Sequence, residues 1–258
     1  MRRLILVLLV LGAASAFGQN ALDGTWKLNT QNLEYQGKET FLLKDGMWRC
    51  DSCTSKAAIK ADGKFHPLSG SPYTDSRSVT VVNDHTVKVV DRKKGKENAA
   101  VTRTASEDGN TLTTEWSSVS DNGAETHGKF TSKRVGDAPA GVNKVSGTWH
   151  PEKIDDASQN GLTFTYKVTA DGITMTDPMG DSYTAKCDGK DYPFKGDPGT
   201  TSVSLKKIDE NTIEETDKRG AKVISVTRMT VAADGKTMKL VVENKLNDST
   251  MHMTAEKQ

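Results

Sequence analysis

Apolar and polar residues alternate along most of the chain, with the period of two that is typical of β-strands buried on one face. The segments TFTYKV at 163–168 and MKLVVE at 238–243 show this alternation clearly. Asp-Gly and Asn-Gly dipeptides, which suit tight hairpin turns because their backbone tolerates positive φ, recur between such segments. They stand at 45–46, 62–63, 108–109, 122–123, 171–172, 188–189 and 234–235. The pattern predicts an all-β chain of consecutive antiparallel strands, with helix only as a short piece around 30–37 or 153–160.

The chain carries two copies of one sequence pattern. DGKFHPLSG at 62–70 is followed 126 positions later by DGKDYPFKG at 188–196, and Thr86 recurs at the same offset as Thr212. Further matches in the same order extend over most of the chain. Solenoid repeats run roughly 20–50 residues, whereas a period near 126 has the size of a whole domain. The sequence therefore predicts a tandem duplication of one domain.

A linker between the copies is expected where glycine and proline gather, in VGDAPAGVNKVS at 135–146. We therefore predict a first repeat at 22–135, a linker at 136–145 and a second repeat at 146–258. Each repeat holds about nine or ten candidate strands. Because an open meander exposes two edges and closure removes them, the expected fold is two tandem homologous antiparallel up-and-down meander barrels. Barrels of this size are filled by side chains or hold one small ligand.

The N-terminal residues have the layout of a secretory signal peptide. Arg2 and Arg3 precede an apolar run at 4–11, and the A-S-A triplet at 14–16 fits a cleavage site. The apolar run is much shorter than the roughly 20 residues that span a bilayer, and no second long apolar stretch follows. We predict a signal peptide at 1–19, a secreted or periplasmic location and no membrane span.

Composition adds limits on the partners of the protein. The 258 residues include 35 Lys and Arg against 34 Asp and Glu, a formal net charge of +1. This balance gives no electrostatic basis for binding nucleic acid or an anionic membrane surface. The longest basic run, Arg92-Lys93-Lys94, is interpreted as a solvated hairpin tip. The hydrophobic fraction of 34% is modest and favours barrel interiors filled partly by threonine and serine.

A Gly-Thr-Trp motif opens each repeat, in LDGTWKLN at 22–29 and VSGTWHPE at 145–152. It resembles the G-x-W signature on the first strand of lipocalins and fatty-acid-binding proteins. The resemblance implies a lipocalin-like barrel with Trp26 or Trp149 at its floor, covered by a basic residue of the last strand, although core packing alone also accounts for both tryptophans. The candidates for the covering residue are Lys133 or Arg134 in the first repeat and Lys257 in the second. The chain is also similar to exported bacterial repeat proteins that have no assigned activity.

Three cysteines are present, Cys50 and Cys53 in the tetrapeptide CDSC and Cys187 far from both. In an exported protein this spacing favours a local disulfide between Cys50 and Cys53, which fixes the loop after a strand. Two alternatives stay open. A redox pair needs the motif at the start of a helix, and half of a zinc site needs further ligands to reach four. Cys187 is interpreted as a buried thiol.

Sequence motifs for catalysis are missing. The chain contains no G-x-S-x-G elbow, P-loop, G-x-G-x-x-G or paired-histidine metal motif. Glu214 and Glu215 are neighbours on an expected strand, so they point to opposite faces and make a poor catalytic pair. We predict that the protein is not an enzyme and has no catalytic residues, metal site or cofactor.

Two functions remain for such a fold. The first is binding of a small apolar or amphipathic ligand inside a barrel, which needs an open interior of roughly 300 Å³ or more. The candidate ligand-binding residues of the second repeat are Phe164, Tyr166, Met175, Leu205, Ile213, Met238, Leu240 and Val242. Those of the first repeat include Phe41, Leu43, Val79, Val81, Leu112 and Trp116. The alternative is a non-catalytic structural or protein-interaction module of the cell envelope, with its function on the outer surface.

Overall fold

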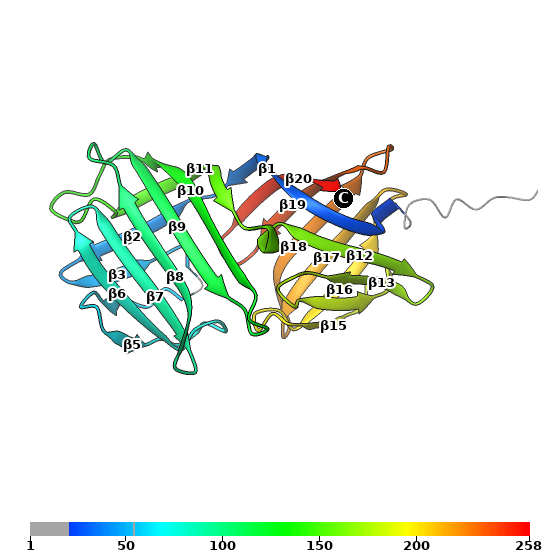
Figure 1. Cartoon of the computed structure of the whole chain (residues 1–258), viewed down its shortest axis with the longest axis horizontal. Coiled ribbons are helices and arrows are strands. Elements are labelled where there is room, and N and C mark those ends of the chain that lie inside the picture. The colour runs from blue at the N-terminus through cyan, green and yellow to red at the C-terminus, as the bar shows by residue number, and fades with distance from the viewer. Residues whose placement is uncertain (1–20, 54) are drawn as a thin grey trace, which may run out of the picture.

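The computed structural model describes residues 21–53 and 55–258, and the signal peptide expected at 1–19 lies outside these described residues. Strands are nearly all of the regular secondary structure in the described chain, and they form two curled antiparallel sheets of ten strands each, side by side in Figure 1. The predicted all-β fold of two up-and-down meander barrels is therefore confirmed. One sheet closes on itself, and we call it the C-terminal barrel; the other is the N-terminal barrel.

The N-terminal barrel is built from strands β2 to β11. In sheet order they are β4 (Ile59–Lys60), β3 (Met47–Cys50), β2 (Glu39–Lys44), β11 (Gly147–Ala157), β10 (Glu125–Val135), β9 (Thr111–Val119), β8 (Lys96–Ala105), β7 (Thr86–Lys93), β6 (Ser76–Asn83) and β5 (Phe65–Pro67).

The C-terminal barrel is built from β1 and the strands from β12 onward. They are β1 (Gly24–Gln36), β12 (Thr163–Thr169), β13 (Gly172–Thr176), β14 (Ser182–Ala185), β15 (Tyr192–Lys195), β16 (Ser202–Lys207), β17 (Thr212–Arg219), β18 (Lys222–Val231), β19 (Thr237–Asn244) and β20 (Ser249–Lys257).

The two repeats exchange their first strands. Strand β1 of the first repeat pairs with β12 and β20, both in the second repeat. Strand β11 of the second repeat pairs with β10 and β2, both in the first. In Figure 1 the blue β1 accordingly lies beside the red β20, and the green β11 lies beside β10 on the other barrel. Each barrel thus contains nine strands of one repeat and one strand of the other.

This pairing corrects the predicted division of the chain. Residues 22–135 and 146–258 are the sequence repeats, but neither range contains all the strands of one barrel. The segment 136–145 joins β10 to β11, which pair with each other, so it is a loop within one sheet and not a linker between barrels. The chain passes between the barrels at 37–38 and at 158–162, after each first strand.

The short helix expected around 30–37 or 153–160 is wrong, because strand occupies most of both ranges. Residues 30–36 continue β1, and residues 153–157 continue β11. Only a single 3₁₀ turn, η1 (Gln159–Gly161), follows β11. Sheet pairing holds these positions as strand: residues 34–36 pair with β20, and residues 153–157 pair with β10.

Each first strand places a tryptophan at one end of the barrel that it completes. Trp26 is fully buried, its indole Nε1 donates to the Leu22 carbonyl at 2.8 Å, and the Lys257 Nζ lies 5.1 Å from a ring centroid of the indole. Trp149 repeats this arrangement, with Arg134 Cζ 4.0 Å from its ring centroid. In each barrel, a basic residue on the last strand of one repeat therefore covers the indole on the first strand of the other repeat. Arg134 covers Trp149, and Lys257 covers Trp26.

The N-terminal barrel differs from the C-terminal barrel in the pairing of two neighbouring strands, a place that we call the seam. In the C-terminal barrel β14 and β15 pair through Ser182 with Lys195 and Tyr183 with Phe194. Within the described part of the N-terminal barrel, the sheet order ends at the equivalent strands β4 and β5, which do not pair. The disulfide predicted between Cys50 and Cys53 is confirmed, and it links the last residue of β3 to the segment that leads to β4, next to this seam.

Cysteine cross-linking tests the strand exchange directly. The Thr25 and Thr165 hydroxyls are 2.9 Å apart across β1 and β12, and those of Thr40 and Thr148 are 3.1 Å apart across β2 and β11. Side chains of directly opposed residues on one face are close enough for a disulfide with small adjustment. We expect Thr25→Cys/Thr165→Cys and Thr40→Cys/Thr148→Cys, each in a Cys187→Ser background, to cross-link within the monomer under mild oxidation.

The control for this experiment is the Thr25→Cys/Thr40→Cys variant. That pair would face each other only if each repeat kept its own first strand. Peptide mapping of the oxidised monomers distinguishes the two arrangements, and efficient cross-linking of the control pair would contradict the exchange.

Candidate functional site

The eight candidate residues of the second repeat belong to the C-terminal barrel, and most form its core. Tyr166, Leu205, Ile213, Met238 and Leu240 are buried in one hydrophobic cluster. Phe164 and Met175 are partly buried and pack against this cluster, whereas Val242 is half-exposed. These side chains contact one another, so a ligand among them would have to displace core packing.

The candidates of the first repeat divide in the same way. Phe41, Leu43, Val79 and Leu112 are buried in the core of the N-terminal barrel. Val81 is 41% exposed because the end of β6 extends beyond the core, so its assignment to the barrel wall is wrong. Trp116 is half-buried.

Sequence reasoning missed a polar layer inside the C-terminal barrel. Glu214 and Glu215 do point to opposite faces: Glu214 pairs outside with Arg228 at 2.7 Å, whereas Glu215 is buried inside and accepts a hydrogen bond from the Tyr183 hydroxyl. Burial raises the pKa of Glu215, and the nearby Asp217 carboxylate raises it further. Burial likewise raises the pKa of Tyr183. The alternation of β17 put Glu215 inside, but no sequence motif marked it.

A cleft of about 360 Å³ separates the two barrels. Its walls come from loops and strand ends of both barrels: residues 72–73, 93, 98–99 and 118–121 of the N-terminal barrel, and residues 179, 181 and 196–198 of the C-terminal barrel. Pockets between domains are common sites for small ligands, and this volume lies within the usual range of roughly 300–1,000 Å³. This inter-barrel cleft is the candidate functional site.

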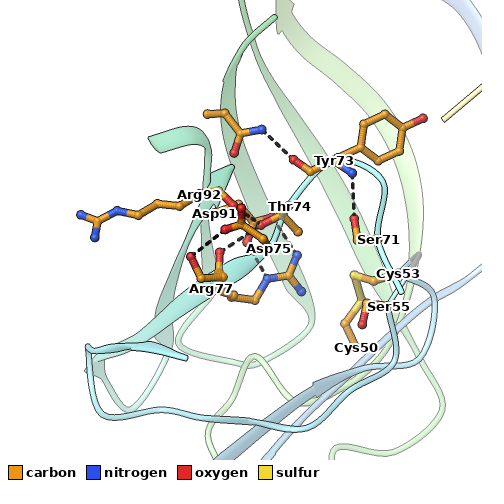
Figure 2. A network of polar contacts seen from close by, with 12 residues as sticks. Cys50, Cys53, Ser55, Ser71, Tyr73, Thr74, Asp75, Arg77, Asp91 and Arg92 are labelled. Carbon is orange, nitrogen blue, oxygen red and sulfur yellow. Dashed lines mark hydrogen bonds and ion pairs between the residues drawn. A yellow bond between two sulfur atoms is a disulfide. The ribbon is translucent and has the colours of Figure 1, made fainter. Parts of the chain in front are cut away.

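Apolar groups form much of the cleft wall. Tyr73 and Val119 are 40% and 42% exposed, although both are large hydrophobic side chains. Pro72, Ala99 and Met179 extend this surface. Lys93 also lines the cleft, but its Nζ donates a hydrogen bond to the Pro72 carbonyl. Figure 2 shows Tyr73 on the loop that leads from the Cys50–Cys53 disulfide side of the N-terminal barrel toward Arg77 and Asp91.

Carboxylates from the C-terminal barrel form the opposite part of the wall. Asp197 accepts a hydrogen bond from the Thr200 hydroxyl at 2.6 Å and one from the Tyr73 hydroxyl at 3.4 Å, which spans the cleft. Burial and the charges of Asp177 and Asp197 raise the pKa of Asp181 to about 6. Burial and Asp197 raise the pKa of Tyr73 to about 12. The cleft therefore combines an apolar face with an acidic one.

Two glycines allow the barrels to approach at this cleft. A Cβ at Gly199 would collide with the Tyr73 hydroxyl, and a Cβ at Gly180 would lie 2.8 Å from the Asn122 amide nitrogen. Asn122 also donates to the Pro178 carbonyl at 3.3 Å. These contacts join loops that are far apart in sequence. The only sequence signal near them is the doubled nonapeptide, whose copies at 62–70 and 188–196 lead into the two cleft loops.

Comparison with known proteins does not place the chain in a family. No protein-family model matches it, and no curated protein sequence matches it. Over residues 21–53 and 55–258, no helix is long and apolar enough to cross a membrane. The same residues contain no group of three or more His, Cys, Asp or Glu side chains arranged to hold a metal ion. The function has to be inferred from the geometry of the cleft.

Proposed function

We propose that this protein is a non-catalytic, exported binding protein that takes a small amphipathic ligand with a cationic group in the inter-barrel cleft. The observation that carries the proposal is the cleft itself, about 360 Å³ in volume, with exposed Tyr73 and Val119 facing the acidic Asp181 and Asp197 side. An apolar body would cover the exposed hydrophobic groups. A cationic group would reach the carboxylates.

Electrostatics favour a cation over a neutral or anionic group. Burial raises the pKa of Asp181, and repulsion from two further carboxylates, Asp177 and Asp197, raises it more. A ligand cation within a few ångströms would relieve this repulsion, because opposite charges at such distances attract by a few kcal/mol at the effective dielectric of a protein surface. Lys93 does not take the place of this cation, because it comes from the opposite wall and its Nζ already donates a hydrogen bond to the Pro72 carbonyl.

Export is part of the proposal. The layout of residues 1–19 supports it, as does the Cys50–Cys53 disulfide, because such bonds persist in oxidising compartments. The packed hydrophobic clusters inside both barrels favour the cleft over the barrel interiors as the site for a ligand of this size. Packed cores are equally compatible with the alternative function, a structural or protein-interaction module, and the test below distinguishes the two functions.

Three probes with one eight-carbon chain test the ligand class: octyltrimethylammonium, octanol and octanoate, measured by isothermal titration calorimetry. We expect the cationic probe to bind most tightly and octanoate most weakly. Asp181→Asn should lower the affinity for the cation about fivefold and leave that for octanol unchanged, since it removes one charge contact of about 1 kcal/mol. Binding of the cation should also weaken as the pH falls below the pKa of Asp181, about 6.

The matched control is Asp209→Asn, which removes an exposed carboxylate outside the cleft. It should change no affinity. Met179→Ser should lower the affinity for the cation and for octanol alike, because it alters the apolar wall. Equal affinity for the three probes, or a cation affinity that Asp181→Asn leaves unchanged, would refute the cationic site; absence of all binding would favour the interaction-module function.

A further inference from the structure

The N-terminal barrel encloses a charged cavity that the inter-barrel cleft does not include. The cavity measures about 80 Å³, and its walls include Arg103, Arg77, Asp91, Trp48 and Cys53. Arg103 projects from β8 and is only 9% exposed. A buried guanidinium normally has its N–H groups paired, because an unpaired buried charge is costly.

Arg103 lacks such partners among the described residues. Its Nε is buried without a hydrogen bond, and its guanidinium lies against two aromatic rings. Its Cζ lies 4.2 Å from the Phe41 ring centroid and 6.0 Å from that of Trp48, and the two rings stack on each other. The aromatic rings hold the cation in place but do not satisfy its donors.

The acidic groups around the cavity do not supply the missing acceptor. Asp91 receives two hydrogen bonds from Arg77, at 2.6 and 2.8 Å, so its carboxylate is already used by another cation; Figure 2 shows this pair. Glu39 approaches from β2 but forms no ion pair with Arg103 within 4 Å, and its own Oε2 is buried without a partner. Burial raises the pKa of Glu39 while Arg103 lowers it.

The duplicated barrel provides a natural comparison. Arg103 pairs with Val87, and Met229 pairs with Ile213 at the equivalent place in the other repeat. Arg77 corresponds to Val203, 126 positions later. The C-terminal barrel thus has apolar side chains in place of the two arginines, and its buried charge in this layer is instead the carboxylate of Glu215, which stands where the N-terminal barrel has Val89. The two arginines belong to the N-terminal barrel only.

We propose that Arg103 binds a small monovalent oxoanion, such as a one- or two-carbon carboxylate or nitrate, in the cavity of the N-terminal barrel. A cavity of about 80 Å³ has room for an anion of a few heavy atoms. It fits such an anion and excludes a fatty chain. A planar oxoanion would accept from the fork of the guanidinium, as carboxylates do.

Titration of the full-length mature protein with sodium formate and sodium nitrate tests the site. The readout is the ¹⁵Nε–¹Hε resonance of Arg103 by NMR, with sodium benzenesulfonate at equal ionic strength as the bulky control. We expect the Arg103 resonance to shift and saturate with formate and nitrate only. An unchanged resonance, or an equal and unsaturated drift with all three salts, would overturn the proposal.

Variants test the same site by thermal unfolding. Arg103→Met copies the residue of the other barrel, and we expect it to abolish the rise in unfolding temperature that formate gives the wild type, with affinity lower by about tenfold or more. The charge-matched control, Arg228→Met on the outer surface, should keep that rise. If Arg103→Met responds to formate as the wild type does, the site is not at Arg103. Should that variant fail to fold, the resonance of Arg103 in the wild type still decides the question.

Discussion

Replacing Trp26 with alanine is expected to unfold the C-terminal barrel, although Trp26 belongs to the first repeat. The indole is fully buried among residues of β12–β20, and large-to-small substitutions of this kind cost about 3–5 kcal/mol. Hydrogen exchange should therefore accelerate in residues 163–257 and change little in residues 39–135. Trp149→Ala should produce the reverse, with loss of protection in the N-terminal barrel.

The matched control is Trp116→Ala, because Trp116 is only half-buried and lies on β9 in the middle of its own repeat. We expect a smaller loss of stability, with faster exchange confined to the N-terminal barrel. If Trp26→Ala instead exposes residues 39–135, each first strand remains with its own repeat and the exchange of β1 and β11 is wrong.

Stability should fall as the pH rises, and Glu215 should be the main cause. Burial and the neighbouring Asp217 carboxylate raise the pKa of Glu215 from 4.5 to about 8, so between these values the folded protein holds a proton that the unfolded chain has released. The folded state therefore loses stability across this window, by up to about 1.4 kcal/mol per pH unit, and the loss levels off above it. Glu215→Gln should be more stable than the wild type at pH 8 and should show a much flatter dependence, as measured by urea unfolding between pH 5 and 9.

Two variants control this prediction. Asp217 also has a pKa raised by burial, so Glu215→Gln/Asp217→Asn should flatten the dependence further. Glu214→Gln changes the neighbouring residue, whose side chain pairs with Arg228 outside the barrel, and should leave the slope as in the wild type. A wild-type stability that rises from pH 5 to 8 would contradict the burial of an ionisable Glu215.

The inter-barrel cleft shows why the candidate site escaped prediction. Tyr73 and Asp197 come from loops of different repeats, and their hydrogen bond depends on how the barrels are placed. Loops also carry no periodicity from which their contacts follow. The candidate wall residues were apolar positions on strands instead, and the alternation located most of them correctly inside a barrel. Such a pattern tells which face is buried, but not whether a core is filled or hollow.

The amino-acid sequence by itself determined most of the strands and the duplication, and it favoured the local disulfide. Alternation with period two, Asp-Gly turns and Cys50–Cys53 spacing are local features, and local backbone geometry responds to them directly. Only the tertiary structure decided which barrel each first strand completes. Both strands carry the same Gly-Thr-Trp motif and offer the same backbone hydrogen bonds and the same indole, so nothing local distinguishes the two positions. The choice depends on packing summed over both barrels, and that packing also creates the cleft between them.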